Sequence, residues 1–216
     1  MRISIINGSP RFKQNISGLL IKEIILELGE EGKNVEEYHL NRRNIDKEKI
    51  ENISCSDAII FAFPLYVDSL PALVLEFLVE MEKNQNKIMN GTPTIYCVIN
   101  NGFFEGRQNH IAIKQMQHWC KKMNFIWGQG IGVGAGEMLP ALSKVPLGKG
   151  PKKNLGEAVK RLCFNIKNLK TDENILFSPN YFRFLWKFQA DLFWILKARD
   201  NGLKIRELYK NWNHTT

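Results

Sequence analysis

The sequence is poor in cysteine and histidine, and residues of neither type are clustered. The chain of 216 residues has four of each, and its cysteines are widely spaced: Cys55, Cys97, Cys120 and Cys163. Zinc and iron–sulfur sites need ligands a few residues apart, so we expect no metal site. Because the neighbours of the cysteines are mostly apolar, we expect reduced, buried thiols.

Long apolar runs are also absent. The N-terminal run ends at once in Asn7-Gly8-Ser9-Pro10, so it is too short for the core of a signal peptide. The longest apolar stretch, residues 58–67, is well short of the roughly 20 residues that span a bilayer. With 44% hydrophobic and 24% charged residues, the composition is that of an ordinary globular protein. We therefore expect a soluble, cytoplasmic protein.

Acidic residues are scarce in one part of the chain only. The net charge is +8, from 30 Lys and Arg against 22 Asp and Glu. Residues 1–143 hold 15 basic and 16 acidic side chains, whereas residues 144–216 hold 15 and 6, so the excess belongs to the C-terminal third. A basic excess can indicate a polyanionic partner. The lysines between 144 and 170 lack the interleaved aromatic residues of a nucleic-acid platform, so we expect no nucleic-acid partner.

Short β-branched runs alternate with longer amphipathic stretches along most of the chain. Strands are predicted at residues 3–6, 35–40, 57–63, 94–99 and 125–133, and helices at residues 17–28, 70–83, 108–123 and 155–169. This alternation predicts an α/β fold with a five-stranded, doubly wound parallel sheet. With strand order 2-1-3-4-5, ligands would bind between the first and third strands.

The pattern changes from residue 171 onward. Residues 180–198 predict a helix that is apolar on most of its circumference, with one polar stripe formed by Arg183, Lys187 and Asp191. We therefore divide the chain into an α/β domain at 1–170 and a C-terminal helical extension at 171–216, which packs on the domain or on a partner subunit. For this basic, apolar helix we expect a second subunit as the partner in preference to peripheral contact with an anionic membrane.

The loop after the first strand carries candidate phosphate ligands. It joins a strand to a helix start and contains Ser9, Arg11 and Ser17. Free N–H groups and the helix dipole favour a phosphate at such a helix start. The alternative is an ordinary turn in which Ser17 is the N-cap of the helix. No Gly-Lys-Ser/Thr follows, which excludes a P-loop.

Two further loops follow the third and fourth strands, at residues 64–72 and 100–106. They would face the same crevice as the first loop, because ligands of open α/β sheets bind beyond the carboxyl ends of the strands. A phosphate-binding loop beside a loop with aromatic side chains suits a ligand that is anionic at one end and flat at the other. Residues 128–136 contain the pattern G-x-G-x-x-A, which is typical of a dinucleotide-binding turn. Such a turn is followed by a helix, whereas Met138-Leu139-Pro140 breaks any helix here. The glycines are better explained by close packing at the fifth strand or by a backbone that passes near the ligand.

Together, the three loops resemble those of flavodoxin-like NAD(P)H-dependent FMN reductases and NAD(P)H:quinone reductases, over about residues 1–170. The matching segments are Gly8-Ser9-Pro10-Arg11 with Ser17, Pro64-Leu65-Tyr66 leading to Pro71-Ala72, and Asn101-Gly102-Phe103-Phe104-Glu105-Gly106. The resemblance implies a flavodoxin-like fold and FMN as the cofactor. The FMN-binding residues that the resemblance implies are Ser9, Pro10, Arg11, Ser17, Pro64, Leu65, Tyr66, Val67, Asn100, Asn101, Gly102 and Phe103.

The same resemblance implies an oxidoreductase with NAD(P)H as co-substrate. A hydride would pass from NAD(P)H to flavin N5 and then to a small-molecule electron acceptor such as a quinone or a flavin. No catalytic side chain is assigned, and a homodimer is expected because a second subunit would complete the flavin pocket. Two alternatives remain: a non-enzymatic FMN electron carrier that docks to a redox partner, and an association protein whose apolar helix contacts a partner or membrane.

Overall fold

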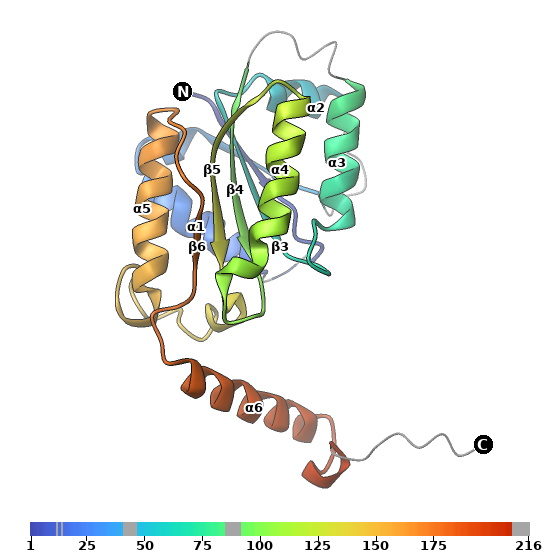
Figure 1. Ribbon diagram of the computed structural model, residues 1–216, viewed down its shortest axis with the longest axis vertical. Helices are drawn as coiled ribbons and strands as arrows, with labels where there is room; N and C mark the ends of the chain where they lie inside the picture. The colour runs from blue at the N-terminus through green and yellow to red at the C-terminus, as the bar shows by residue number, and fades with distance from the viewer. Residues whose placement is uncertain (12, 14, 41–46, 85–91, 209–216) are drawn as a thin grey trace, which may run out of the picture. The chain divides into compact units, whose positions relative to one another are not determined.

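A single parallel sheet of six strands, in the order β2-β1-β3-β4-β5-β6, forms the centre of the first part of the chain (Figure 1). The computed structural model describes residues 1–11, 13, 15–40, 47–84 and 92–208. The strands are β1 Ile3–Asn7, β2 Val35–His39, β3 Ala58–Pro64, β4 Thr94–Asn100, β5 Ile126–Val133 and β6 Ile175–Phe177. The predicted order of the first five strands is confirmed, but the prediction of only five strands is wrong.

The sixth strand lies in the segment that we expected to begin the extension. β6 pairs with β5 over three residues, from Ile131–Ile175 to Val133–Phe177. It is held by the side chain of Asn174, whose Oδ1 accepts hydrogen bonds from the Gly130 amide at 2.8 Å and Trp127 Nε1 at 3.2 Å. Three residues are too few to show a period of two in the sequence, which is why the strand escaped prediction.

The chain divides into two compact units, Met1–Asn180 and Tyr181–Thr216. Residues 171–180 therefore belong with the sheet rather than with the helix that follows. The helices of the first unit are α1 Ile16–Leu28, α2 Lys47–Ser54, α3 Ala72–Lys83, α4 His110–Lys122 and α5 Lys153–Lys167. Helix α2 was not predicted, because its only buried apolar residues are Ile50 and Ile53.

Two apolar cores flank the sheet, one on each face. On one face α2, α3 and α4 pack against residues such as Phe61 and Phe63 of β3. On the other face α1 and α5 pack against alternate residues such as Ile60 of the same strand. Coverage of both faces explains why β3 is continuously apolar instead of alternating.

Three of the four cysteines are buried in these cores, as expected, but Cys55 is exposed. It directly follows the last residue of α2, Ser54, in a surface turn, so that part of the expectation is wrong. Burial raises the pKa of the Cys97 thiol and raises those of Cys120 and Cys163 to about 12. These three thiols are therefore protonated at neutral pH and behave as small apolar side chains.

The second unit consists of α6, Arg183–Asp200, and a short 3-10 turn, η6, at Ile205–Glu207. Among its described residues, 181–208, none is buried. No helix in the described part of the chain is long and apolar enough to cross a bilayer.

Candidate functional site

A pocket of about 100 Å³ lies where β1, β3 and β4 end, at the edge predicted for ligand binding. Its lining comes from the loop after β1, the start of α1, the ends of β3 and β4 and the turn after β5: Ser9, Arg11, Asn15, Ile16, Ser17, Pro64, Leu65, Tyr66, Asn100, Asn101, Gly102 and Glu137. Nine of the twelve residues expected at the site line this pocket. The other three, Pro10, Val67 and Phe103, lie in the same loops but outside the lining.

Three lining residues were not among those expected: Asn15, Ile16 and Glu137. Asn15 is the N-cap of α1, and its Oδ1 accepts a hydrogen bond from the Gly18 amide at 2.7 Å. An Asn directly before an apolar helical pattern is a recognisable N-cap signal. The alternative explanation of Ser17 as the N-cap is therefore wrong, because Ser17 lies inside the first turn of the helix.

Ser17 is instead tied to the end of β4. Its buried hydroxyl oxygen accepts a hydrogen bond from Asn100 Nδ2 at 3.1 Å, and the same amide group donates to the Phe63 carbonyl at 3.2 Å. The Leu65 amide in turn donates to the Asn100 carbonyl at 2.8 Å. One side chain, Asn100, thus joins the helix start to the ends of both β3 and β4.

The loop after β1 curls around the start of α1. The Ser9 amide donates to Asn7 Oδ1 at 3.2 Å, and the Arg11 amide donates to the Ser9 hydroxyl oxygen at 3.4 Å. Asn7 is buried, and its Nδ2 has no hydrogen-bond partner within the described chain. A Cβ at Gly18 would lie 3.6 Å from this nitrogen, which places it beside the first turn of α1.

An unpaired buried donor is unfavourable unless something accepts from it. Here it lies next to the free N–H groups at the N-terminus of a 13-residue helix, with the Arg11 side chain on the same pocket. Such a set of donors can bind an anionic group. Arg11 and Glu137 carry the charges among the lining residues.

The loop after β3 makes a tight turn with an unusual backbone. Tyr66 and Ser69 exchange two main-chain hydrogen bonds, of 3.1 and 3.0 Å. The two residues between them have positive φ angles, +48° at Val67 and +54° at Asp68. Positive φ at both central positions is the signature of a type I′ turn, which normally has Asn and Gly there. Val67 is 98% exposed at the tip of this turn.

The loop after β4 leaves space above the pocket. A Cβ at Gly102 would meet nothing closer than Glu137 Cδ, at 4.0 Å, and its backbone does not have a positive φ. Packing within the chain therefore does not require a glycine at this position, whereas a ligand bound close to the backbone would. Asn101, which lines the pocket, has a buried side-chain oxygen without a partner in the described chain.

The turn after β5 is fastened to this same loop and carries Glu137. The Ala135 amide donates to the Phe103 carbonyl at 2.5 Å, and the Gly136 amide donates to the Asn101 carbonyl at 2.8 Å. A Cβ at Gly136 would lie only 3.2 Å from atoms of Asn100 and Asn101. The tight contact between the two loops places the next residue, Glu137, at the pocket.

The prediction that the glycines at 128–136 reflect close packing at the fifth strand is confirmed. A Cβ at Gly128 would overlap the Tyr96 ring, and one at Gly132 would overlap the Leu176 side chain of β6. These glycines therefore allow the strand to approach its neighbours.

Comparison with known proteins agrees with the fold. A family model for the flavodoxin-like fold matches residues 1–121. No curated protein sequence matches the chain. Among solved structures, the Trp repressor binding protein from Bacillus subtilis is 18% identical with a TM-score of 0.57, over 74% of this chain and 98% of that one. An NADPH-quinone reductase from P. pentosaceus is 18% identical with a TM-score of 0.53, over 80% and 99%.

A third similar structure contains a ligand. It is an FMN-dependent NADH-azoreductase from Bacillus anthracis in complex with FMN, 11% identical with a TM-score of 0.53, over 76% of this chain and 100% of that one. At these identities the structures demonstrate a shared fold only. The family model covers more than half of the chain and agrees with the observed strand order. The chain therefore belongs to the flavodoxin-like fold family.

Proposed function

We propose that this chain is an FMN-dependent oxidoreductase that passes a hydride from NAD(P)H to a quinone, a flavin or a similar small acceptor. The observation that carries the proposal is the convergence of nine expected FMN-binding residues on one pocket at the N-terminus of α1. The similar folds of the NADPH-quinone reductase and the FMN-dependent NADH-azoreductase support it.

The donors at the start of α1 suit the phosphate of FMN. Ser9, Ser17 and Arg11 line the pocket, and the unpaired Asn7 Nδ2 lies beside them. A phosphate there would accept hydrogen bonds from the free helix N–H groups and from these side chains. It would also satisfy a buried donor that the chain itself leaves unpaired.

The remainder of the cofactor would extend beyond the pocket. Sites that enclose a whole small ligand measure about 300–1,000 Å³, against about 100 Å³ here. Tyr66 lines the pocket and Phe103 follows the lining residue Gly102. Their rings are 42% and 54% exposed and offer flat apolar surfaces to a ring. Bound FMN supplies the hydride chemistry, whereas the residues of this chain bind and orient it.

An open ring site also supports the expectation of a homodimer. Tyr66, Val67 and Phe103 are exposed side chains of the loops after β3 and β4, and a second copy of the first unit bound against these loops would cover both them and the ring. Sedimentation of the FMN-loaded protein tests this part of the proposal. A mass of two chains is expected, and a mass of one chain at micromolar concentration would contradict it.

Titration with FMN followed by anaerobic NAD(P)H tests the function. We expect stoichiometric FMN binding, and loss of the oxidised flavin absorbance when NADPH or NADH is added without oxygen. Protein that binds FMN but is not reduced by either nucleotide would favour the electron-carrier alternative. Protein that does not bind FMN would overturn both.

The substitution Arg11→Ala tests the phosphate site directly. It removes one charge-assisted contact, so FMN affinity should fall by about 10- to 100-fold. Lys13→Ala is the matched control, because it removes a cation from the same loop but not from the pocket lining. The FMN dissociation constants are measured by fluorescence quenching. Equal constants for the two variants would exclude the assignment of Arg11 to the phosphate site.

A further inference from the structure

The second unit exposes many large apolar side chains. Within its described residues, ten large hydrophobic side chains are exposed, and Phe184 and Phe188 keep 68% and 66% of their surface accessible. Monomeric soluble proteins rarely show contiguous apolar patches of more than a few hundred Å². No residue of this unit lines the pocket of the first unit, so the proposed oxidoreductase function does not account for these side chains.

The apolar side chains form one stripe along α6. Phe184, Phe188 and Leu192 are spaced four residues apart, and Leu185 and Leu196 fall on the same face of the helix. The cations Arg183, Lys187 and Lys197 lie on the other side together with Asp191, whereas Arg199, in the last turn, falls on the side of the stripe.

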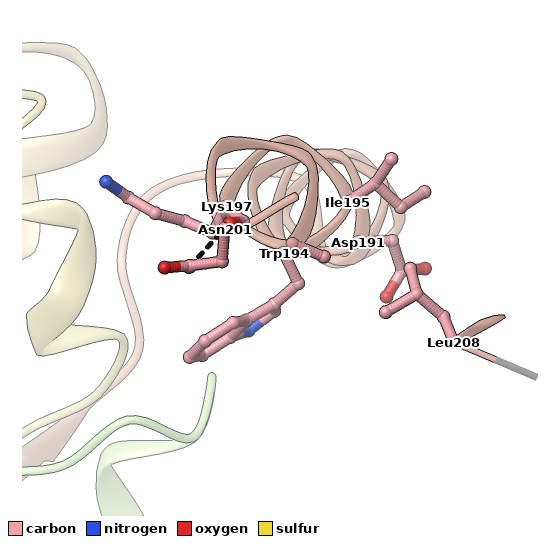
Figure 2. A pocket seen from close by; sticks show the side chains of 7 residues that line it. Asp191, Trp194, Ile195, Lys197, Asn201 and Leu208 are labelled. Atoms are coloured by element: carbon pink, nitrogen blue, oxygen red, sulfur yellow. Dashed lines mark hydrogen bonds between the residues drawn. The ribbon is translucent and has the colours of Figure 1, made fainter. Parts of the chain in front are cut away.

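Figure 2 shows that residues of the same unit form a pocket on this charged side of the helix. Asp191, Trp194 and Asn201 of the α6 region line a pocket of about 540 Å³ together with Leu208, which follows η6. The chain thus folds back mainly over the charged side of the helix and reaches Ile195 at the edge of the stripe. Among the described residues of this unit, Phe184, Phe188, Leu192 and Leu196 of the stripe stay exposed, and Leu185 is half-buried.

Charge distinguishes between the possible partners of the stripe. Residues 181–208 carry six Lys and Arg against three Asp and Glu, a net of +3. Residues 1–180 carry 23 against 19, a net of +4, so a second copy of the chain has the same sign on both units. An anionic lipid surface attracts Lys and Arg side chains, by about 1 kcal/mol for each one that lies near the surface.

We propose that α6 binds flat on an anionic lipid bilayer, with its apolar stripe in the acyl boundary. At a rise of about 1.5 Å per residue, its 18 residues extend about 27 Å along the surface. Phe and Leu on one side, with most of the Lys and Arg on the other, is the pattern of interfacial helices. The long stems of Lys187 and Lys197 allow their ammonium groups to reach the headgroups. This reverses the preference for a second subunit that we drew from the sequence.

Flotation of the full-length protein with lipid vesicles tests the proposal. Vesicles of phosphatidylcholine with 25 mol% phosphatidylglycerol should bind the protein, and pure phosphatidylcholine should bind it at least about tenfold more weakly. The double variant Phe188→Gln, Leu192→Gln should weaken binding to the anionic vesicles by about 100-fold, because it removes two buried apolar groups. The control Ala190→Gln places a glutamine on the charged side, outside the pocket lining, and should bind within about threefold of the wild type.

Two results would overturn the proposal. One is absence of binding to the anionic vesicles, or equal binding by Phe188→Gln, Leu192→Gln and wild-type protein. The other is a lipid-free oligomer that this double variant dissociates and the control does not, which would make a second copy the cover of the stripe. FMN binding by each variant reports whether the first unit is folded, and circular dichroism reports the helix content.

Discussion

Val67 adopts a backbone conformation that β-branched residues rarely hold. Its φ is +48°, and its side chain is almost fully exposed, so no packing in the chain offsets the strain. Strained backbone of this kind is often found at binding loops, where the shape of the turn matters more than its stability. Here the turn lies between Tyr66 and Ser69, beside the proposed ring site.

Replacing Val67 by Asn should stabilise the protein without ligand. Asn tolerates positive φ, so the free energy of unfolding should rise by about 1 kcal/mol. The same change at Val79, an exposed residue of helix α3, is the control and should have little effect. Urea denaturation measures both, and a lower unfolding midpoint for Val67→Asn would contradict the argument.

Glu137 places a carboxylate on the pocket that we assign to a phosphate. Substitution by Gln removes a repulsive charge, so FMN should bind about threefold to fivefold more tightly at low ionic strength. The gain should shrink in 0.5 M salt, because salt screens exposed charges. Glu157→Gln on helix α5 makes the same charge change away from the pocket and should leave the dissociation constant as it is.

At the scale of elements, one side-chain cluster fixes the segment that leads into β6. Asp172 accepts two hydrogen bonds of 2.6 Å from the Arg161 guanidinium of α5 and one of 2.9 Å from Asn165 Nδ2. Its backbone amide donates to the Gly128 carbonyl of β5 at 2.9 Å. The cluster thus connects α5, β5 and the chain that enters the sixth strand.

The same cluster predicts a dependence of stability on pH. The Arg161 hydrogen bonds, followed by that from Asn165, hold the pKa of the Asp172 carboxyl well below its ordinary value. Because the folded-state pKa is lowered, the stabilisation is fully present above the unfolded-state pKa near 4 and is lost as pH falls through the lower, folded-state value.

Asp172→Asn should therefore lower the urea midpoint at pH 7. The difference from the wild type should narrow as the pH is lowered below about 4, because the unfolded wild type then binds a proton at this carboxyl while the folded protein keeps it charged. Glu173→Gln changes the neighbouring charge and is the control, with little expected change. A gap between wild type and Asp172→Asn that stays constant from pH 7 to pH 3 would contradict this role.

At the scale of the whole molecule, ligand binding and stability are linked in the first unit. FMN at 100 times its dissociation constant should raise the free energy of unfolding by about 2.7 kcal/mol. Riboflavin, which has the same ring but no phosphate, should stabilise far less at the same concentration, because the donors at the start of α1 would have no anion to bind. Equal stabilisation by both ligands in thermal denaturation would exclude the phosphate assignment.

The sequence alone determined the fold of the first unit and most of the candidate site. Continuous apolar runs such as 57–63 identify buried parallel strands, and loops at their carboxyl ends meet at one edge by topology. The resemblance of these loops to those of FMN reductases then implied twelve site residues, nine of which line the pocket. The N-cap Asn15 had a local signal that the motif of neighbouring serines obscured.

Tertiary structure decided what depends on contacts between distant segments. Glu137 reaches the pocket only because the turn after β5 is bonded to the loop after β4, and no local pattern encodes that contact. β6 exists because Asn174 binds β5, although its three residues have no periodicity of their own. The sequence marked α6 as apolar and basic, but only the fold showed which of its sides the rest of its own unit leaves uncovered.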